Sequence, residues 1–141
     1  MSLAAETERD LRRDLAQFTG TTTWYQLSPL YRHVGTDGVV FLADAAGCYW
    51  LLDMIASHLT SMDAMIYESQ AFFRKSPEGE GGRFTLEGYK NNSTDELADD
   101  PIVLASQDVS FTDFPLNEIE IRVSAYDHEN RRYVFFLPSE R

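Results

Sequence analysis

The stretch EIEIRVSA, residues 118–125, decides the fold class of this chain. Ile119, Ile121, Val123 and Ala125 alternate with polar residues, so a strand would place the apolar set on one face and the polar set on the other. A strand of this kind is typical of an antiparallel sheet with one face on the core and one in water. The sequence therefore predicts a sheet that is covered on one side.

Other segments of the same half of the chain also have the composition of strands. A glycine-rich loop at 75–83 separates two of them, which predicts a hairpin, and Pro138 ends the last one because proline cannot continue a ladder. The predicted strands beside the first are residues 65–74, 84–89, 102–109 and 133–137. The loop 127–131 is expected to return the chain from the first strand into residues 133–137, as a second hairpin.

The first sixty residues have a helical period instead. Residues 4–18 predict an amphipathic helix, and a second helix from near Gly38 to about Leu59 is apolar around most of its circumference. Gly47 lies in the middle of that helix, where it either admits a close neighbour or breaks the helix; we favour close packing. Residues 19–31 are expected to be extended or irregular.

These patterns predict an α+β fold. We expect an N-terminal amphipathic helix and a central buried helix on one face of an antiparallel, mostly meander sheet of about four or five strands. The 141 residues favour a single domain, 1–141, with a helical part at about 4–60 and a sheet part at about 63–138.

Composition and charge exclude several classes of protein. With 43% hydrophobic and 25% charged residues the chain is typical of a packed domain rather than a disordered tail. The 12 basic and 23 acidic side chains give a net charge of −11, and no basic stripe is present, so direct binding to nucleic acid or to an anionic membrane is not expected. The most apolar stretch, residues 45–52, is much shorter than the roughly 20 residues of a membrane span. A single cysteine, Cys48, and no apolar leader favour the cytoplasm.

The negative charge is concentrated in one part of the chain. Residues 91–121 hold eight acidic side chains and no basic one, which would attract a basic partner. One hypothesis is a binding protein that inhibits or regulates a basic protein; a solvated acidic face is the simpler interpretation, which we favour. Exposed edge strands also make a homodimer an open alternative. The candidate partner-binding residues are Asp95, Glu96, Asp99, Asp100, Glu118 and Glu120.

A few side chains have the chemistry of a catalytic or metal site. The candidates are His33, Asp37 and Asp53, but their spacing matches no metal-binding signature, and Asp37 or its neighbour Thr36 is explained as a helix cap. Cys48 is interpreted as a buried apolar residue rather than a nucleophile. No cofactor is expected, because glycines 79, 81 and 82 lack the spacing of a phosphate-binding loop.

Asp53 needs a partner if it lies in an apolar helix. We expect it to accept hydrogen bonds from Trp24, Tyr25 or the backbone of residues 19–23, and so to hold that segment against the helix. For the chain as a whole, the leading hypothesis is a non-enzymatic protein that acts by protein–protein association. The alternative is a small hydrolase or metal-dependent enzyme with a cleft near Tyr25, His33, Asp37 and Asp53.

Five short segments resemble those of a family of small uncharacterised bacterial proteins associated with plasmids, phages or other mobile elements. The resemblance spans residues 15–140 and is interrupted at about 62–108. It implies a shared fold and a bacterial or mobile-element origin, and it brings no activity, cofactor or catalytic residue. The segments are FTGT with the following WY (18–25), TDGV (36–39), YWLLD (49–53), FTDFPL (111–116) and LPSE (137–140).

Overall fold

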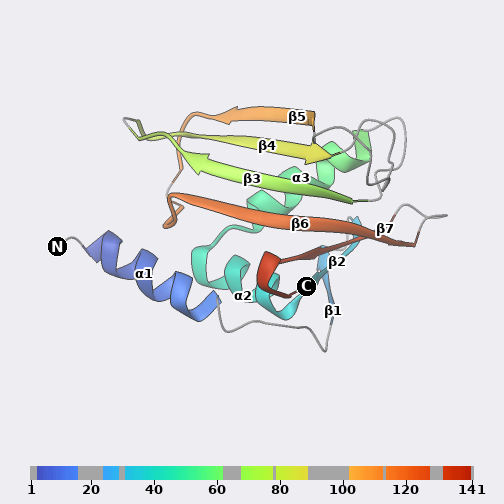
Figure 1. Cartoon of the computed structure of the whole chain (residues 1–141), viewed down its shortest axis with the longest axis horizontal. Helices are drawn as coiled ribbons and strands as arrows, with labels where there is room; N and C mark the ends of the chain where they lie inside the picture. The colour runs from blue at the N-terminus through green and yellow to red at the C-terminus, as the bar shows by residue number, and fades with distance from the viewer. Residues whose placement is uncertain are drawn as a thin grey trace.

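The computed structural model describes residues 3–15, 24–28, 31–61, 68–77, 79–88, 102–112, 114–127 and 132–140. Within these ranges the chain forms three α-helices, a seven-stranded sheet and a short 3-10 helix, in an α+β arrangement (Figure 1). The helices are α1 (Leu3–Leu15), α2 (Asp37–Ala46), α3 (Tyr49–Ser61) and the 3-10 turn η1 (Pro138–Glu140). The strands are β1 (Trp24–Ser28), β2 (Tyr31–Thr36), β3 (Glu68–Lys75), β4 (Gly82–Gly88), β5 (Ile102–Val109), β6 (Glu118–Asp127) and β7 (Arg132–Phe136).

The strands are arranged in the order β1-β2-β7-β6-β3-β4-β5. All neighbours are antiparallel except β2 and β7, which run parallel. The two expected hairpins are present: Phe73 lies opposite Phe84 in β3–β4, and Val123 lies opposite Phe135 in β6–β7. Both hairpins join segments that are close in sequence, so the alternation of polar and apolar residues and the short loops between them are enough to predict the hairpins.

The expectation of four or five strands in a wholly antiparallel sheet was wrong. The two additional strands, β1 and β2, come from the part of the chain that we expected to be irregular or to lead into a helix. Both are short, and β2 pairs with β7 about 100 residues later through Val34 with Val134 and Gly35 with Phe135. A parallel pair between distant segments has no local signal in the sequence.

The sheet has a covered and an open face, as the sequence predicts. On β6, Ile121 and Val123 are buried, and Phe73 on β3 meets the indole of Trp50 in α3, with ring centroids 5.3 Å apart. In Figure 1, α3 lies behind the strands, α2 lies below β6 and contacts β2 and β7, and the near face carries no helix over β3, β4 and β5. Gln70 and Arg74 on β3 and their partners Arg122 and Glu118 on β6 point to this open face, because alternate residues of a strand point to opposite sides.

The central helix is broken, and the prediction of close packing at Gly47 was wrong. Gly47 has φ +62° and ends α2, with its N–H donating to the carbonyl of Ala43. A Cβ atom at this position would meet nothing within 4 Å, so the glycine is required by its left-handed backbone and not by a neighbour. Helix α3 begins two residues later.

Candidate functional site

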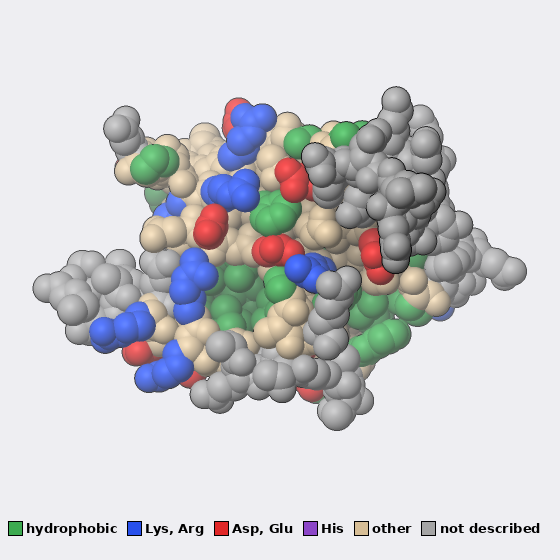
Figure 2. All heavy atoms as spheres, viewed as in Figure 1, with side chains coloured by type: hydrophobic (Ala, Val, Ile, Leu, Met, Phe, Trp, Pro, Cys, Tyr) green, Lys and Arg blue, Asp and Glu red, His purple; other side chains and the backbone are tan. Residues whose placement is uncertain are grey.

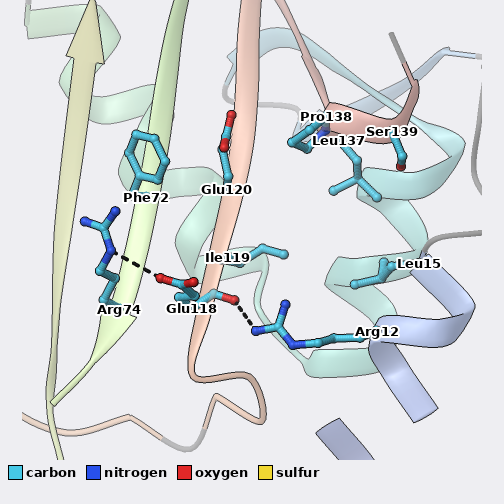
Figure 3. A pocket seen from close by; sticks show the side chains of 10 residues that line it. All are labelled: Arg12, Leu15, Phe72, Arg74, Glu118, Ile119, Glu120, Leu137, Pro138 and Ser139. Atoms are coloured by element: carbon cyan, nitrogen blue, oxygen red, sulfur yellow. Dashed lines mark hydrogen bonds and ion pairs between the residues drawn. The ribbon is translucent and has the colours of Figure 1, made fainter. Parts of the chain in front are cut away.

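A groove of about 380 Å³ lies between α1, strand β6 and the turn η1 (Figure 3). Leu15 and Leu137 are buried and Ile119 is half-buried, so the groove has an apolar floor with charged side chains along its rim. Figure 2 shows the same place as a hollow with apolar side chains inside it, between the sheet and α1. The groove is lined by Arg12, Leu15, Phe72, Arg74, Glu118, Ile119, Glu120, Leu137, Pro138 and Ser139.

The groove exists because the first four residues of β6, 118–121, extend beyond the end of its ladder with β7. The last ladder pair joins Phe136 to Arg122. In the same register the next residue facing that edge, Glu120, would lie opposite Pro138, which has no N–H to donate. The chain turns into η1 there, so among the described residues no strand pairs with residues 118–121 of β6 on this side.

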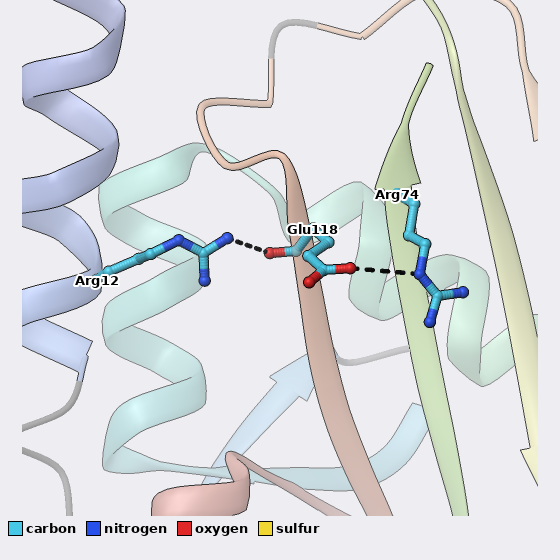
Figure 4. Close-up of polar contacts among 3 residues, drawn as sticks. All are labelled: Arg12, Arg74 and Glu118. Carbon is cyan, nitrogen blue, oxygen red and sulfur yellow. Dashed lines mark hydrogen bonds and ion pairs between the residues drawn. The ribbon is translucent and has the colours of Figure 1, made fainter. Parts of the chain in front are cut away.

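The hydrogen bonds at the start of β6 show which way its backbone groups point. The carbonyl of Asn117 accepts from the N–H of Lys75 on β3 at 2.8 Å, so the following carbonyl points to the other side. That carbonyl, of Glu118, accepts from Nη2 of Arg12 at 2.9 Å (Figure 4). Because alternate residues of a strand direct their backbone groups to the same edge, the N–H and C=O of Glu120 also point toward the groove.

The rim of the groove carries paired charges. Arg74 lies directly opposite Glu118 across the β3–β6 ladder, with Nε to Oε2 at 3.3 Å, and its guanidinium carbon lies 4.9 Å from the ring centroid of Phe72. Arg122 contacts Oε2 of Glu120 at 2.9 Å. These pairs are exposed or partly exposed, so each contributes little to stability, but together they alternate positive and negative charge along the groove.

The two described candidates for partner binding, Glu118 and Glu120, are therefore not part of a purely acidic face. Glu118 and Glu120 are both close to arginines, and Asp108 on β5 lies opposite Arg83 on β4, with 3.2 Å between Nη1 and Oδ1. A count over residues 91–121 misses this, because Arg74 and Arg83 lie on other strands and Arg122 lies just beyond the end of that stretch. Asp95, Glu96, Asp99 and Asp100 lie outside the described residues.

The catalytic candidates are in different surroundings from one another. His33 is buried in β2, its Nδ1 accepts from the N–H of Tyr133 at 3.3 Å, and its ring stacks on Phe135. Burial lowers the pKa of His33, which favours the neutral ring. Asp37 is partly exposed in the first turn of α2, where a negatively charged carboxylate interacts favourably with the helix dipole and stabilises the helix.

Asp53 is exposed on α3, so it is not the buried carboxylate that our expectation required. Trp24 and Tyr25 are about half exposed on β1, and among the described residues neither of them donates a hydrogen bond to Asp53. Residues 19–23, the other proposed donors, lie outside the described part. Within the described ranges, no three His, Cys, Asp or Glu side chains gather closely enough to hold a metal ion.

Cys48 is fully buried, and its thiol donates a weak hydrogen bond to the carbonyl of Leu42 at 3.7 Å. Burial raises the pKa of this thiol to about 12, so it is protonated at neutral pH. This surrounding is typical of a structural cysteine, as the sequence predicts.

The sequence reasoning missed Glu140, a buried carboxylate that joins two of the five motif segments. Its Oε1 accepts from the hydroxyl of Thr36 at 2.5 Å and from the N–H of Leu137 at 2.9 Å, and its Oε2 accepts from the N–H of Gly38 at 3.0 Å. Thr36 is also the N-cap of α2, accepting from the N–H of Val39. Segment 137–140 thus holds the start of the helix that segment 36–39 begins.

Two more of the segments meet in the core. Phe114 is fully buried and its ring lies edge-on to Trp50 and Phe73, with centroids 6.3 and 5.6 Å apart. Segment 111–116 therefore packs on segment 49–53. These motif side chains hold the fold together, and segment 137–140 also lines the groove with Leu137, Pro138 and Ser139.

Comparison with known families covers nearly the whole chain, residues 9–141. The chain belongs to DUF6876, a family of unknown function. No curated protein and no solved structure matches the chain. In this DUF6876 member the matched residues include β6, η1 and all of α1 except its first six residues. The elements that form the groove therefore lie within the region shared with the family. Within the described residues no helix is long and apolar enough to cross a membrane.

Proposed function

We propose that this protein acts by associating with another protein, and that the groove beside β6 is the contact site. The observation that carries the proposal is that, in the part of the chain that the structure describes, no strand pairs with residues 118–121 of β6 on the groove side. This open edge lies next to an apolar floor formed by Leu15, Ile119 and Leu137. Backbone groups that lack a ladder partner and apolar side chains at the surface are what a partner chain can cover.

The charge of the chain supports a partner with a basic surface. A net charge of −11 attracts such a protein over several ångströms and repels acidic ones, whereas the alternating Arg and Glu side chains at the rim give short-range specificity. A protein that occupies a basic surface in this way would inhibit or regulate its partner.

A non-enzymatic role is favoured by the state of two side chains whose chemistry suits a nucleophile or a base. Cys48 is buried with a raised pKa, and His33 is buried with its Nδ1 committed to a backbone N–H. Neither arrangement activates a nucleophile. The proposed setting is the bacterial cytoplasm, supported by the resemblance of the five motif segments and by the single buried cysteine.

The test is site-specific photo-crosslinking in cells that naturally carry the chain. A benzophenone amino acid replaces Phe72 in the groove or, as the control, the exposed Tyr49 on α3, which does not line the groove. We expect one discrete protein adduct from position 72 that position 49 does not give. The adduct should weaken in Glu120→Arg, which reverses a rim charge, and between 50 and 500 mM salt as screening increases. Equal patterns from the two positions would overturn the proposal.

A further inference from the structure

We propose that the groove takes an extended segment of the partner chain as an added strand, paired with β6 in line with β7. This inference rests on the proposed function and specifies how the partner is held. It follows from the direction of the β6 backbone, from the length of its open edge, and from the side chains on its two sides.

The open edge offers a set of hydrogen-bonding groups in ladder geometry. The N–H and C=O of both Glu118 and Glu120 point to the side that β7 covers farther along, where Arg122 and Ser124 pair with Phe136 and Val134. An antiparallel strand laid in line with β7 would exchange two hydrogen bonds with each of these two residues. β6 lies in the interior of the sheet order, and its strand neighbour on the other side, β3, is fully paired along the same four residues.

The size of the groove fits a short strand. The four residues 118–121 span about 13 Å at the usual rise of a strand. Pro138 stands at one end, where the ladder with β7 breaks off, and Arg12 lies at the other. The edge can therefore pair with three or four residues of a partner and no more.

Among the described residues, the side chain of Arg12 occupies part of the place that a neighbouring strand would take beside Glu118. Its guanidinium donates to the carbonyl of Glu118, the group that would otherwise accept from the N–H of a neighbouring strand. A helix that covers part of an edge is a common way to keep an open strand from pairing with unrelated chains. The side chain of Arg12 is long and single-bonded along its stem, so an entering strand can displace it without moving α1.

The surroundings of the edge define the chemistry of the segment. Residues that lie opposite each other in an antiparallel pair point to the same face, so partner residues opposite Glu118 and Glu120 would point to the open face beside those carboxylates. The partner residue between them would point to the other side, onto Leu15, Ile119 and Leu137. The segment is thus an apolar residue between two basic ones, in keeping with the net charge of −11.

The probe is a random dodecapeptide library displayed on phage and selected on the full-length protein. We expect the enriched peptides to share the pattern basic, apolar, basic, and to lose affinity by about tenfold or more for Glu120→Arg. A library that yields no peptide sensitive to Glu120→Arg overturns the proposal.

Strand pairing has a signature that side-chain recognition lacks. A synthetic consensus peptide is N-methylated at one residue at a time, and only alternate positions should lose affinity, by about tenfold. On binding, the amide of Glu120 should become protected from hydrogen exchange, whereas that of Ile121, already paired with β3, should change little. Arg12→Ala should bind at least as tightly as the original protein, since the competing guanidinium is gone.

The outcomes separate this inference from the function on which it rests. Loss of affinity at every N-methylated position, or no protection of the Glu120 amide, overturns strand addition. If position 72 still gives its specific adduct in cells, the association itself stands and only the mode of binding is wrong. If position 72 gives no specific adduct, the proposed function fails.

Discussion

The carboxylate of Glu140 accepts a hydrogen bond from the backbone N–H of Gly38 at 3.0 Å, across 102 residues of sequence. This contact places a negative charge at the N-terminus of α2, where the helix leaves N–H groups without intrahelical partners. The fit is close, because a Cβ on Gly38 would lie 2.6 Å from Oε1 of Glu140. The end of the chain therefore fixes the helix that packs beneath β2 and β7, and η1 in turn forms one wall of the groove.

Removal of this carboxylate should destabilise the protein. Glu140→Ala leaves the N–H groups of Gly38 and Leu137 and the hydroxyl of Thr36 buried without their acceptor, and we expect the free energy of unfolding to fall by about 2–4 kcal/mol. Glu140→Gln keeps one oxygen acceptor and should lose less. Urea denaturation measures both, with the exposed neighbour Ser139→Ala as the control. Equal midpoints for Glu140→Ala and Ser139→Ala would contradict this role.

Gly47 tests whether the central helix is broken. In a continuous helix Gly47→Ala would stabilise the protein by about 1 kcal/mol, because alanine favours a helix interior. At φ +62° the same substitution should instead destabilise it by about 1 kcal/mol, and Gly47→Asn should cost less because asparagine tolerates that region. The sign of the change in thermal or urea stability decides between the two, with no need for an absolute value.

The sequence predicted those elements whose partners are close in the chain. The β3–β4 and β6–β7 hairpins could be read from the alternation around residues 119–125 and from the glycine-rich loop, since each joins neighbouring segments. β2 could not be read, because its strand character depends on a parallel pair with β7 that forms only in the folded chain.

The groove was beyond sequence reasoning for the same reason. Its walls come from Arg12 and Leu15, from Glu118 to Glu120, and from Pro138, which are far apart in the chain. Two of its signals were nevertheless visible: Pro138 as the end of a strand, and acidic residues alternating along β6. What the sequence could not show is that Arg74 contacts Glu118 from the neighbouring strand and that Arg122 contacts Glu120 along β6.

The buried thiol of Cys48 should be unreactive in the folded protein. Burial raises its pKa to about 12, and no solvent reaches it, so an aromatic disulfide reagent at pH 8 should modify the native protein far more slowly than the protein in 8 M urea. Absorbance of the released thiolate follows the reaction. Rapid modification of the native protein, at a rate close to that in urea, would show that the thiol is exposed or activated.

His33 should make stability depend on pH in the mildly acidic range. Burial lowers its pKa below the ordinary value of 6.5, so above that pH the ring is neutral in both states and stability is at its full value. As the pH falls below about 6.5, the unfolded chain binds a proton that the folded protein resists, and the free energy of unfolding decreases. The slope for one proton is at most about 1.4 kcal/mol per pH unit.

Protonation of His33 would also remove the Nδ1 acceptor of the Tyr133 N–H and weaken the junction of β2 with β7. Urea midpoints from pH 7.5 to pH 5 measure the effect, and His33→Asn, which keeps an acceptor near the Nδ1 position, is the matched variant. Since the other two histidines are the same in both proteins, the original should lose stability more steeply than His33→Asn; parallel curves would show that His33 does not resist protonation.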